Sequence, residues 1–192
     1  MAEIVLYHHV QGLTEGVRSF AGLLREAGHT VHTPDLFDGR TFATLDEGMA
    51  HAREAGIRAL VERGVAAAGD LAPELVYAGM SFGVMAAQQL AQTRPGARGA
   101  LLLHACLPVT EFGSAWPDGV PVQVHGMEGD PFFAEEGGDL DAARALVDAA
   151  PEAELFLYPG DQHLFTDASL PAYDDAAAAL LTERVREFLD RV

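Results

Sequence analysis

The sequence predicts an α/β fold: a doubly wound, mostly parallel sheet of about six strands with helices on both faces and no large cap domain. Two observations support this prediction. Short apolar runs typical of buried strands alternate with longer amphipathic segments typical of helices along the whole chain. Clusters of Gly, Pro and Asp separate the two kinds of segment. Parallel strands joined by right-handed helical crossovers satisfy this alternation.

The expected strands are short apolar runs closed by turn residues, and they cover residues 4–8, 30–33, 75–78, 100–104, 120–124 and 153–158. The expected helices carry apolar residues at helical spacing. The first runs from Leu13 to Leu24 and stops before Gly28. One long amphipathic helix follows from about Leu45 to Arg63, with inward-facing Met49, Ala52, Ala59 and Leu60. The other helices are expected over residues 84–90, 140–147 and 181–192.

Length and charge limit the classes of function. A chain of 192 residues with 49% hydrophobic residues and no break in composition is expected to form one domain, residues 1–192. Its net charge of −17 argues against nucleic acid or an anionic membrane as a partner. All the basic residues are arginines, so a lysine Schiff base and a P-loop are excluded.

No cofactor or metal is expected. Cys106 has no partner for a disulfide, and no paired Cys/His spacing suggests zinc. His8, His104 and His125 stand at strand ends, but no spaced carboxylates complete a metal-binding set with them. A free cysteine, with neither a signal-like leader nor a long apolar run, favours a cytoplasmic protein.

The most informative motif is Gly79-Met80-Ser81-Phe82-Gly83, which joins an expected strand to an expected helix. The flanking glycines permit a turn sharp enough to expose the Ser81 hydroxyl. The start of the following helix favours negative charge beside that hydroxyl. The pattern is typical of a nucleophilic serine.

An acid and a histidine follow in the order that such a serine requires, each after its own strand. Asp130 follows the strand at 120–124 through a turn at 125–129 that also contains Glu128, its nearby rival. His163 follows the strand at 153–158. Taken alone, Asp130 also suits a turn and His163 an ordinary loop. Together they favour a Ser81–His163–Asp130 triad.

Asp161 and Asp167 are further rivals as partners of His163, but they lie too close to it in the sequence to come from a separate strand. Several apolar side chains are expected near the catalytic end: Leu13, Met80, Phe82, Phe112, Trp116, Phe132, Phe133, Leu164 and Phe165. Ordinary core packing is the alternative explanation, and it is favoured for Leu13, Met80 and Phe165. Trp116, Phe132 and Phe133, together with Leu164, are the candidates for lining a substrate pocket.

The chain resembles the dienelactone hydrolase family, a compact branch of the α/β hydrolases. The resemblance rests on residues 4–13, 28–37, 79–83, 124–130 and 158–165. It implies an esterase or lactonase with the triad Ser81, Asp130 and His163. The amide following a nucleophile commonly donates to the oxyanion, here that of Phe82. The resemblance implies the Val10 amide as the second donor.

Three positions depart from the family pattern. Ser81 stands where the family typically has cysteine, and His9 replaces a glutamate beside the oxyanion loop. His9 is a candidate for contact with substrate or nucleophile, or a polar residue satisfied at a strand end. Asp167 replaces an arginine that would bind a substrate carboxylate, so anionic substrates are disfavoured.

The expected function is therefore a cofactor-free serine hydrolase for small esters or lactones, as a monomer or homodimer. Two alternatives stay open: an inactive scaffold that binds a small ligand or a partner protein, and a hydrolase acting on thioesters or organophosphate triesters.

Overall fold

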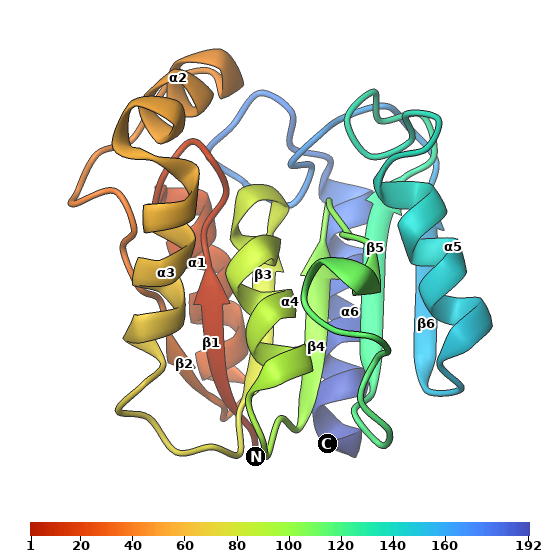
Figure 1. Cartoon of the computed structure of the whole chain (residues 1–192). Coiled ribbons are helices and arrows are strands. Elements are labelled where there is room, and N and C mark those ends of the chain that lie inside the picture. Colours follow the sequence, from red (N-terminus) through yellow and green to blue (C-terminus); the bar gives the residue numbers. More distant parts are fainter.

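A computed structural model describes all residues, 1–192, and contains one six-stranded sheet whose strands are all parallel (Figure 1). The strand order is β2-β1-β3-β4-β5-β6. The strands are β1 (Glu3–Tyr7), β2 (Thr30–His32), β3 (Val76–Met80), β4 (Gly99–Leu103), β5 (Val122–Met127) and β6 (Ala153–Tyr158). The predicted parallel sheet is confirmed.

Helices cover both faces of the sheet. One face carries α1 (Glu15–Glu26) and α6 (Asp175–Arg191), which lie behind the sheet in Figure 1. The other carries α3 (Ile57–Ala67), α4 (Val84–Thr93) and α5 (Asp139–Ala149), while α2 (Leu45–Ala55) lies above α3 near the carboxyl ends of the strands. None of the helices has the length and apolar character that a membrane span needs.

The core has two halves because alternate residues of each strand face opposite sides of the sheet. Val5 and Tyr7 of β1 pack toward α3 and α4, whereas Ile4 and Leu6 pack toward α1 and α6. Every residue of β3 and β4 is buried, as expected for central strands covered on both faces.

The single long helix predicted from Leu45 to Arg63 is wrong, because the chain breaks at Gly56 into α2 and α3. Gly56 has φ 87° and ψ 105°, which lie outside the helical region. The break changes the helical phase. Ala52 and Leu60 are buried as predicted, but Ala59 is exposed.

Strand β5 is longer than predicted, since residues 125–127 continue the strand rather than forming a turn. The β5–β6 ladder continues to the pair Met127 and Tyr158. Within it, the His125 ring lies 2.8 Å from the Tyr158 hydroxyl and 3.1 Å from Gln123 Oε1, so this buried polar residue is satisfied without leaving the strand.

Two glycines let β3, the start of α4 and the end of β1 meet closely. A Cβ atom on Gly79 would lie 2.5 Å from the Gly83 carbonyl carbon. A Cβ atom on Gly83 would lie 2.4 Å from the Tyr7 carbonyl oxygen and 2.7 Å from that of His8. Only glycine permits this backbone-to-backbone approach, which holds the turn after β3 against the end of β1.

Three buried histidines lie at the carboxyl ends of the strands. His8 is bonded through Nδ1 to the His9 carbonyl at 2.7 Å, and His104 is bonded through Nε2 to the Thr166 hydroxyl at 2.8 Å. Burial lowers the pKa of His8 to about 4, that of His125 to about 3 and that of His104 well below its ordinary value. Each stays neutral at ordinary pH. No group of three or more potential ligands is placed to hold a metal ion.

Replacing Gly83 with alanine is expected to destabilise the fold by about 1–3 kcal/mol, because the new methyl group meets backbone that cannot move aside easily. Gly22→Ala in α1 is the matched control. Its Cβ meets nothing within 4 Å, so it is expected to stabilise the protein by about 0.5–1 kcal/mol. Urea unfolding of both variants tests this, and equal effects of the two substitutions would contradict it.

Acid is expected to lower the unfolding free energy well before the carboxylates titrate. In the unfolded chain, His8 and His125 have pKa values near 6.5. In the folded protein, burial lowers these values to about 4 and about 3, so the unfolded state binds more protons as the pH falls. Each of these two histidines therefore lowers the unfolding free energy by about 2 kcal/mol as the pH falls from about 7.5 to about 5. Asp139 acts in the opposite direction. Burial raises its pKa to about 6, so the folded protein binds one proton there as the pH falls, which offsets part of the loss.

Urea unfolding at these two pH values measures the effect. Since His125→Gln removes one of the neutral imidazoles, the difference in unfolding free energy between the two pH values should shrink. An unchanged difference would show that His125 is not held neutral in the folded protein.

Candidate functional site

The nucleophile candidate Ser81 directly follows β3 and begins the short 3-10 turn η1 (Ser81–Gly83), which leads into α4. Its φ of 48° is left-handed, an unusual conformation for a residue other than glycine. The close packing at Gly79 and Gly83 keeps it there. Such strain is typical of functional turns, and here it leaves the Ser81 side chain partly exposed.

His163 reaches Ser81 from the loop after β6. Its Nε2 lies 2.9 Å from Ser81 Oγ, and its Nδ1 lies 2.6 Å from Asp130 Oδ2. Asp130 comes from the loop after β5 and is fully buried. Its other oxygen accepts the Phe132 amide at 2.9 Å. The three predicted residues therefore form one continuous hydrogen-bonded chain.

The hydrogen bonds among these three residues run in the direction that activation of a hydroxyl requires. A carboxylate accepts the Nδ1 proton of His163, which leaves Nε2 as the acceptor for the Ser81 proton. None of the rival acids contacts His163: Glu128 is exposed, Asp161 bonds the side chain of Gln162, and Asp167 bonds His9. Asp130 alone is placed to orient the imidazole.

The candidate oxyanion donors border the same turn. Val10 lies in the tight turn after β1, in which the Gly12 amide donates to the His9 carbonyl. The Val10 amide itself makes no hydrogen bond within the chain. The carbonyls of Tyr7 and His8 pack against Gly83, so the Val10 turn adjoins the turn that carries Ser81 and Phe82.

His9 does not line the cleft, contrary to its predicted place in the substrate site. It is fully buried, with Nε2 2.7 Å from Asp167 Oδ2, and its Nδ1 accepts the Gln11 amide at 3.2 Å. Burial alone would raise the pKa of Asp167, but hydrogen bonds from His9, Ser169 and Thr14 lower it to about 2. Asp167 is thus an internal anchor between the loops after β1 and β6.

The predicted pocket-lining residues separate into one that is exposed and three that are not. Phe132 is 57% exposed, and its ring lies 5.0 Å from that of His163. Phe133 is fully buried against Gly126, and Leu164 is also buried. Phe133 belongs to the core cluster on the α3–α5 face, and neither Phe133 nor Leu164 reaches the surface.

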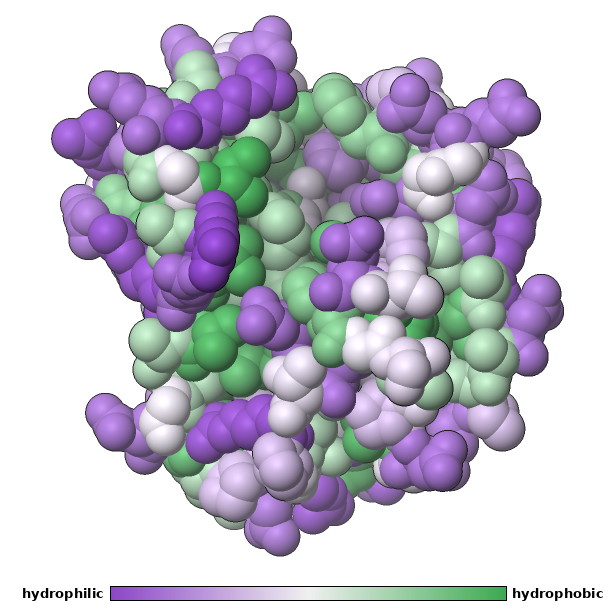
Figure 2. All heavy atoms as spheres, viewed as in Figure 1, coloured by the Kyte–Doolittle hydropathy of each residue, from purple (hydrophilic) through white to green (hydrophobic).

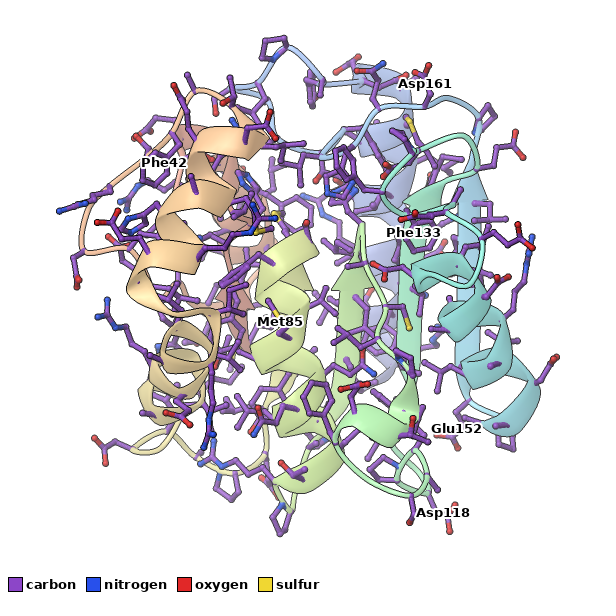
Figure 3. All side chains as sticks on the ribbon, turned by 45° about the horizontal axis from the view of Figure 1, so that its top comes forward. Phe42, Met85, Asp118, Phe133, Glu152 and Asp161 are labelled. Carbon is purple, nitrogen blue, oxygen red and sulfur yellow. The ribbon has the colours of Figure 1, made fainter.

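Trp116 lies at the wrong end of the sheet for a substrate contact. It lines a small depression with Asp118 and Glu152, which Figure 3 shows at the opposite end of the molecule from Asp161. Its indole donates to the Val120 carbonyl at 2.7 Å. The sequence contained the necessary signal: a residue just before a strand lies at the amino edge of a parallel sheet, away from the site.

Sequence reasoning missed an aromatic cluster beside Phe82. The Phe37 ring lies 5.8 Å from that of Phe82, and Phe42 lies 5.0 Å from His51 of α2. Figure 2 shows the surface hollowed at the top of the view, between α2 and the loop after β5. The break at Gly56, which the sequence pattern did not reveal, is what lets α2 lie above α3 at this end of the sheet.

Sequence reasoning also gave His104 no part beside the triad. Its ring lies 5.9 Å from the His163 ring, and its Nδ1 is buried without a partner. The sequence signal that could have identified His104 is the same one that identified Asp130 and His163: a polar residue at the end of an apolar strand.

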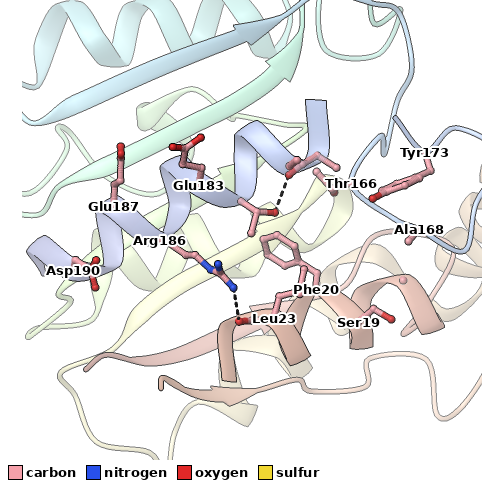
Figure 4. A pocket seen from close by; sticks show the side chains of 14 residues that line it. Ser19, Phe20, Leu23, Thr166, Ala168, Tyr173, Glu183, Arg186, Glu187 and Asp190 are labelled. Carbon is pink, nitrogen blue, oxygen red and sulfur yellow. Dashed lines mark hydrogen bonds between the residues drawn. The ribbon is translucent and has the colours of Figure 1, made fainter. Parts of the chain in front are cut away.

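A separate groove of about 480 Å³ lies between α1 and α6 on the other face (Figure 4). Phe20, Tyr173 and Arg186 line it together with acidic side chains of α6. Ser19 is present, but no histidine lines the groove. It therefore lacks the paired hydroxyl and imidazole found at Ser81.

Solved structures with the same fold include several hydrolases. A protein from Klebsiella pneumoniae, provisionally assigned as a dienelactone hydrolase, is 16% identical, with TM-score 0.72 over 100% of this chain and 88% of its own. A dienelactone hydrolase-like promiscuous phosphotriesterase from metagenomic libraries is 18% identical, with TM-score 0.72 and coverages of 100% and 86%. A cold-adapted esterase from an Arctic intertidal metagenomic library is 18% identical, with TM-score 0.63 and coverages of 96% and 81%.

A comparison with curated protein sequences finds no match. The sequence profile of the dienelactone hydrolase family matches the whole chain, residues 1–192. That match agrees with the parallel six-stranded sheet. The protein therefore belongs to the dienelactone hydrolase family, within the α/β hydrolases.

Proposed function

We propose that this protein is a serine hydrolase that cleaves small, neutral or weakly polar carboxylic esters or lactones. The observation that carries the proposal is the continuous contact from Ser81 Oγ through His163 to Asp130, at 2.9 and 2.6 Å. Membership of a hydrolase family supports it. The chain's own side chains and amides supply every group that the reaction needs.

In the first half of the reaction, Ser81 Oγ attacks the acyl carbon while His163 Nε2 takes the hydroxyl proton. The carbonyl oxygen becomes an oxyanion, which the amides of Val10 and Phe82 stabilise. The carbon–oxygen bond to the leaving group then breaks, and the imidazolium gives its proton to the departing oxygen. The product is an acyl-Ser81 ester.

In the second half, water attacks the acyl carbon and gives its proton to His163. The same two amides hold the oxyanion, and the proton returns to Ser81 as the acid leaves. Asp130 stays ionised throughout and stabilises the imidazolium. Its complete burial makes this interaction strong, because little water screens it.

Charge favours neutral substrates. The molecule carries a net charge of −17. Position 167 holds an aspartate bonded to His9 and Ser169, so no cation stands there to bind a substrate carboxylate. Asp139, half-buried at the start of α5, adds negative charge near Asp130. An anionic acyl group would meet only repulsion from these groups.

Organophosphate triesters are the second candidate class, because a dienelactone hydrolase-like phosphotriesterase shares the fold. The same serine and oxyanion donors suit attack at phosphorus, and thioesters are attacked at carbon as esters are. An inactive scaffold, in contrast, requires that Ser81 be unreactive.

Intact mass spectrometry after incubation with a fluorophosphonate tests whether Ser81 is activated. The expected result is a single adduct on the wild type, none on Ser81→Ala and much slower labelling of His163→Ala. Absence of an adduct on folded wild type, under conditions that label a known serine esterase, would favour the inactive scaffold. Labelled enzyme then goes to a panel of neutral esters, their carboxylate-bearing analogues, a thioester and a phosphotriester.

Asp130→Asn is expected to lower kcat for a neutral ester by about 10³- to 10⁴-fold, since an amide neither fixes the imidazole tautomer nor stabilises the imidazolium. Asp161→Asn is the matched control, because Asp161 precedes His163 by two residues and does not contact it. Steady-state kinetics on both variants makes the comparison. Equal effects would rule out Asp130 as the orienting acid.

A further inference from the structure

We propose that His8 is a positioning residue that locks the His9–Val10 peptide so that the Val10 amide faces the reacting oxygen. The inference rests on the proposed function and adds a residue to it. His8 does not touch Ser81 or His163. Its importance comes from the peptide that it holds.

The protonation state of the His8 ring follows from its partners. Nδ1 lies 2.7 Å from the His9 carbonyl oxygen, which only accepts, so Nδ1 carries the proton. Nε2 accepts the Leu36 amide at 3.0 Å and is therefore unprotonated. The ring is fully buried, and Phe37 packs edge-on against it at 4.8 Å. His8 is thus a neutral imidazole with a single tautomer.

The His8 bond determines where the Val10 amide points. The His9 carbonyl and the Val10 N–H belong to one trans peptide unit, so they point in opposite directions. The His9 carbonyl accepts from His8 Nδ1 and from the Gly12 amide at 3.0 Å. Turning the peptide over would lose both bonds in a buried place. The Val10 amide is thereby held on the opposite side.

Neighbouring peptides are held by contact as well. The His8 carbonyl packs against Gly83, and a Cβ atom on Gly48 of α2 would lie 2.1 Å from the Val10 carbonyl oxygen. His9, anchored on Asp167, holds the Gln11 amide. The amides of Gln11 and Gly12 both donate within this turn, whereas the Val10 amide, the one that the proposed reaction uses, has no acceptor in the chain.

Two substitutions separate the His8 donor from the His8 volume. An asparagine amide nitrogen falls near the position of imidazole Nδ1, whereas a glutamine amide falls near Nε2. His8→Asn therefore retains a donor for the His9 carbonyl, and His8→Gln does not. His29→Gln is the control, since His29 is a buried histidine that accepts the Ala2 amide at the amino end of the sheet.

Steady-state hydrolysis of p-nitrophenyl acetate is measured per active site titrated with a fluorophosphonate. His8→Gln is expected to lower kcat roughly 10- to 100-fold with little change in KM, since it weakens one oxyanion donor. His8→Asn should keep most of kcat, and His29→Gln should match the wild type. The Ki of an aryl trifluoromethyl ketone, whose adduct carries the oxyanion, should rise in His8→Gln in proportion to the loss of kcat.

Wild-type kcat in His8→Gln, or equal losses in both His8 variants, would overturn the proposal. A second measurement needs no variant: proton NMR of the wild type should show a slowly exchanging His8 Nδ1–H signal that shifts when the trifluoromethyl ketone binds. Its absence would also overturn the proposal. Full activity of Ser81→Ala would instead refute the proposed function itself.

Discussion

The backbone contact between Gly83 and the end of β1 is the constraint on which the site depends. It places the turn that carries Ser81 directly against the loop that carries Val10, with no side chain between them. Because β1 and β3 are adjacent parallel strands, their carboxyl ends are already level, and the two glycines bring the following turns into contact. β5 and β6 then deliver Asp130 and His163 from the same edge. The site therefore depends on two features: the order of the parallel strands, and the lack of side chains at Gly79 and Gly83.

Much of this followed from the sequence. Mostly apolar runs located five of the strands, and the short segment 30–33 before Pro34 located β2. A polar residue beyond a strand located Ser81, Asp130 and His163. Two of the failures share a cause, which is that the deciding hydrogen-bond partner is distant in the sequence. His125 stays within β5 because Tyr158 satisfies it, and His9 is internal because Asp167 does so. Gly56 looks like any glycine in a helix until its backbone angles are known.

The polar interior near the site is organised by imidazoles as much as by carboxylates. His8, His9 and His104 are all buried, and each has at least one bond to the loops that surround Ser81 or His163. A neutral imidazole donates at one nitrogen and accepts at the other, so it joins two backbone segments with a fixed direction. This property suits loops whose amides must point one way. It also keeps net charge out of the interior, apart from Asp130 and Asp167.

Asp167 has a consequence for how this chain changes over evolutionary time. A Cβ atom on Gly16 would lie 1.6 Å from Asp167 Oδ1, so the carboxylate occupies space that any other residue at position 16 would fill. Its charge also depends on donors from His9, Thr14 and Ser169. Replacing Asp167 by arginine alone would put a cation among donors and against a helix start. Position 167 is therefore coupled to positions 9, 14, 16 and 169, and a residue of different size or charge there would require compensating changes on both loops.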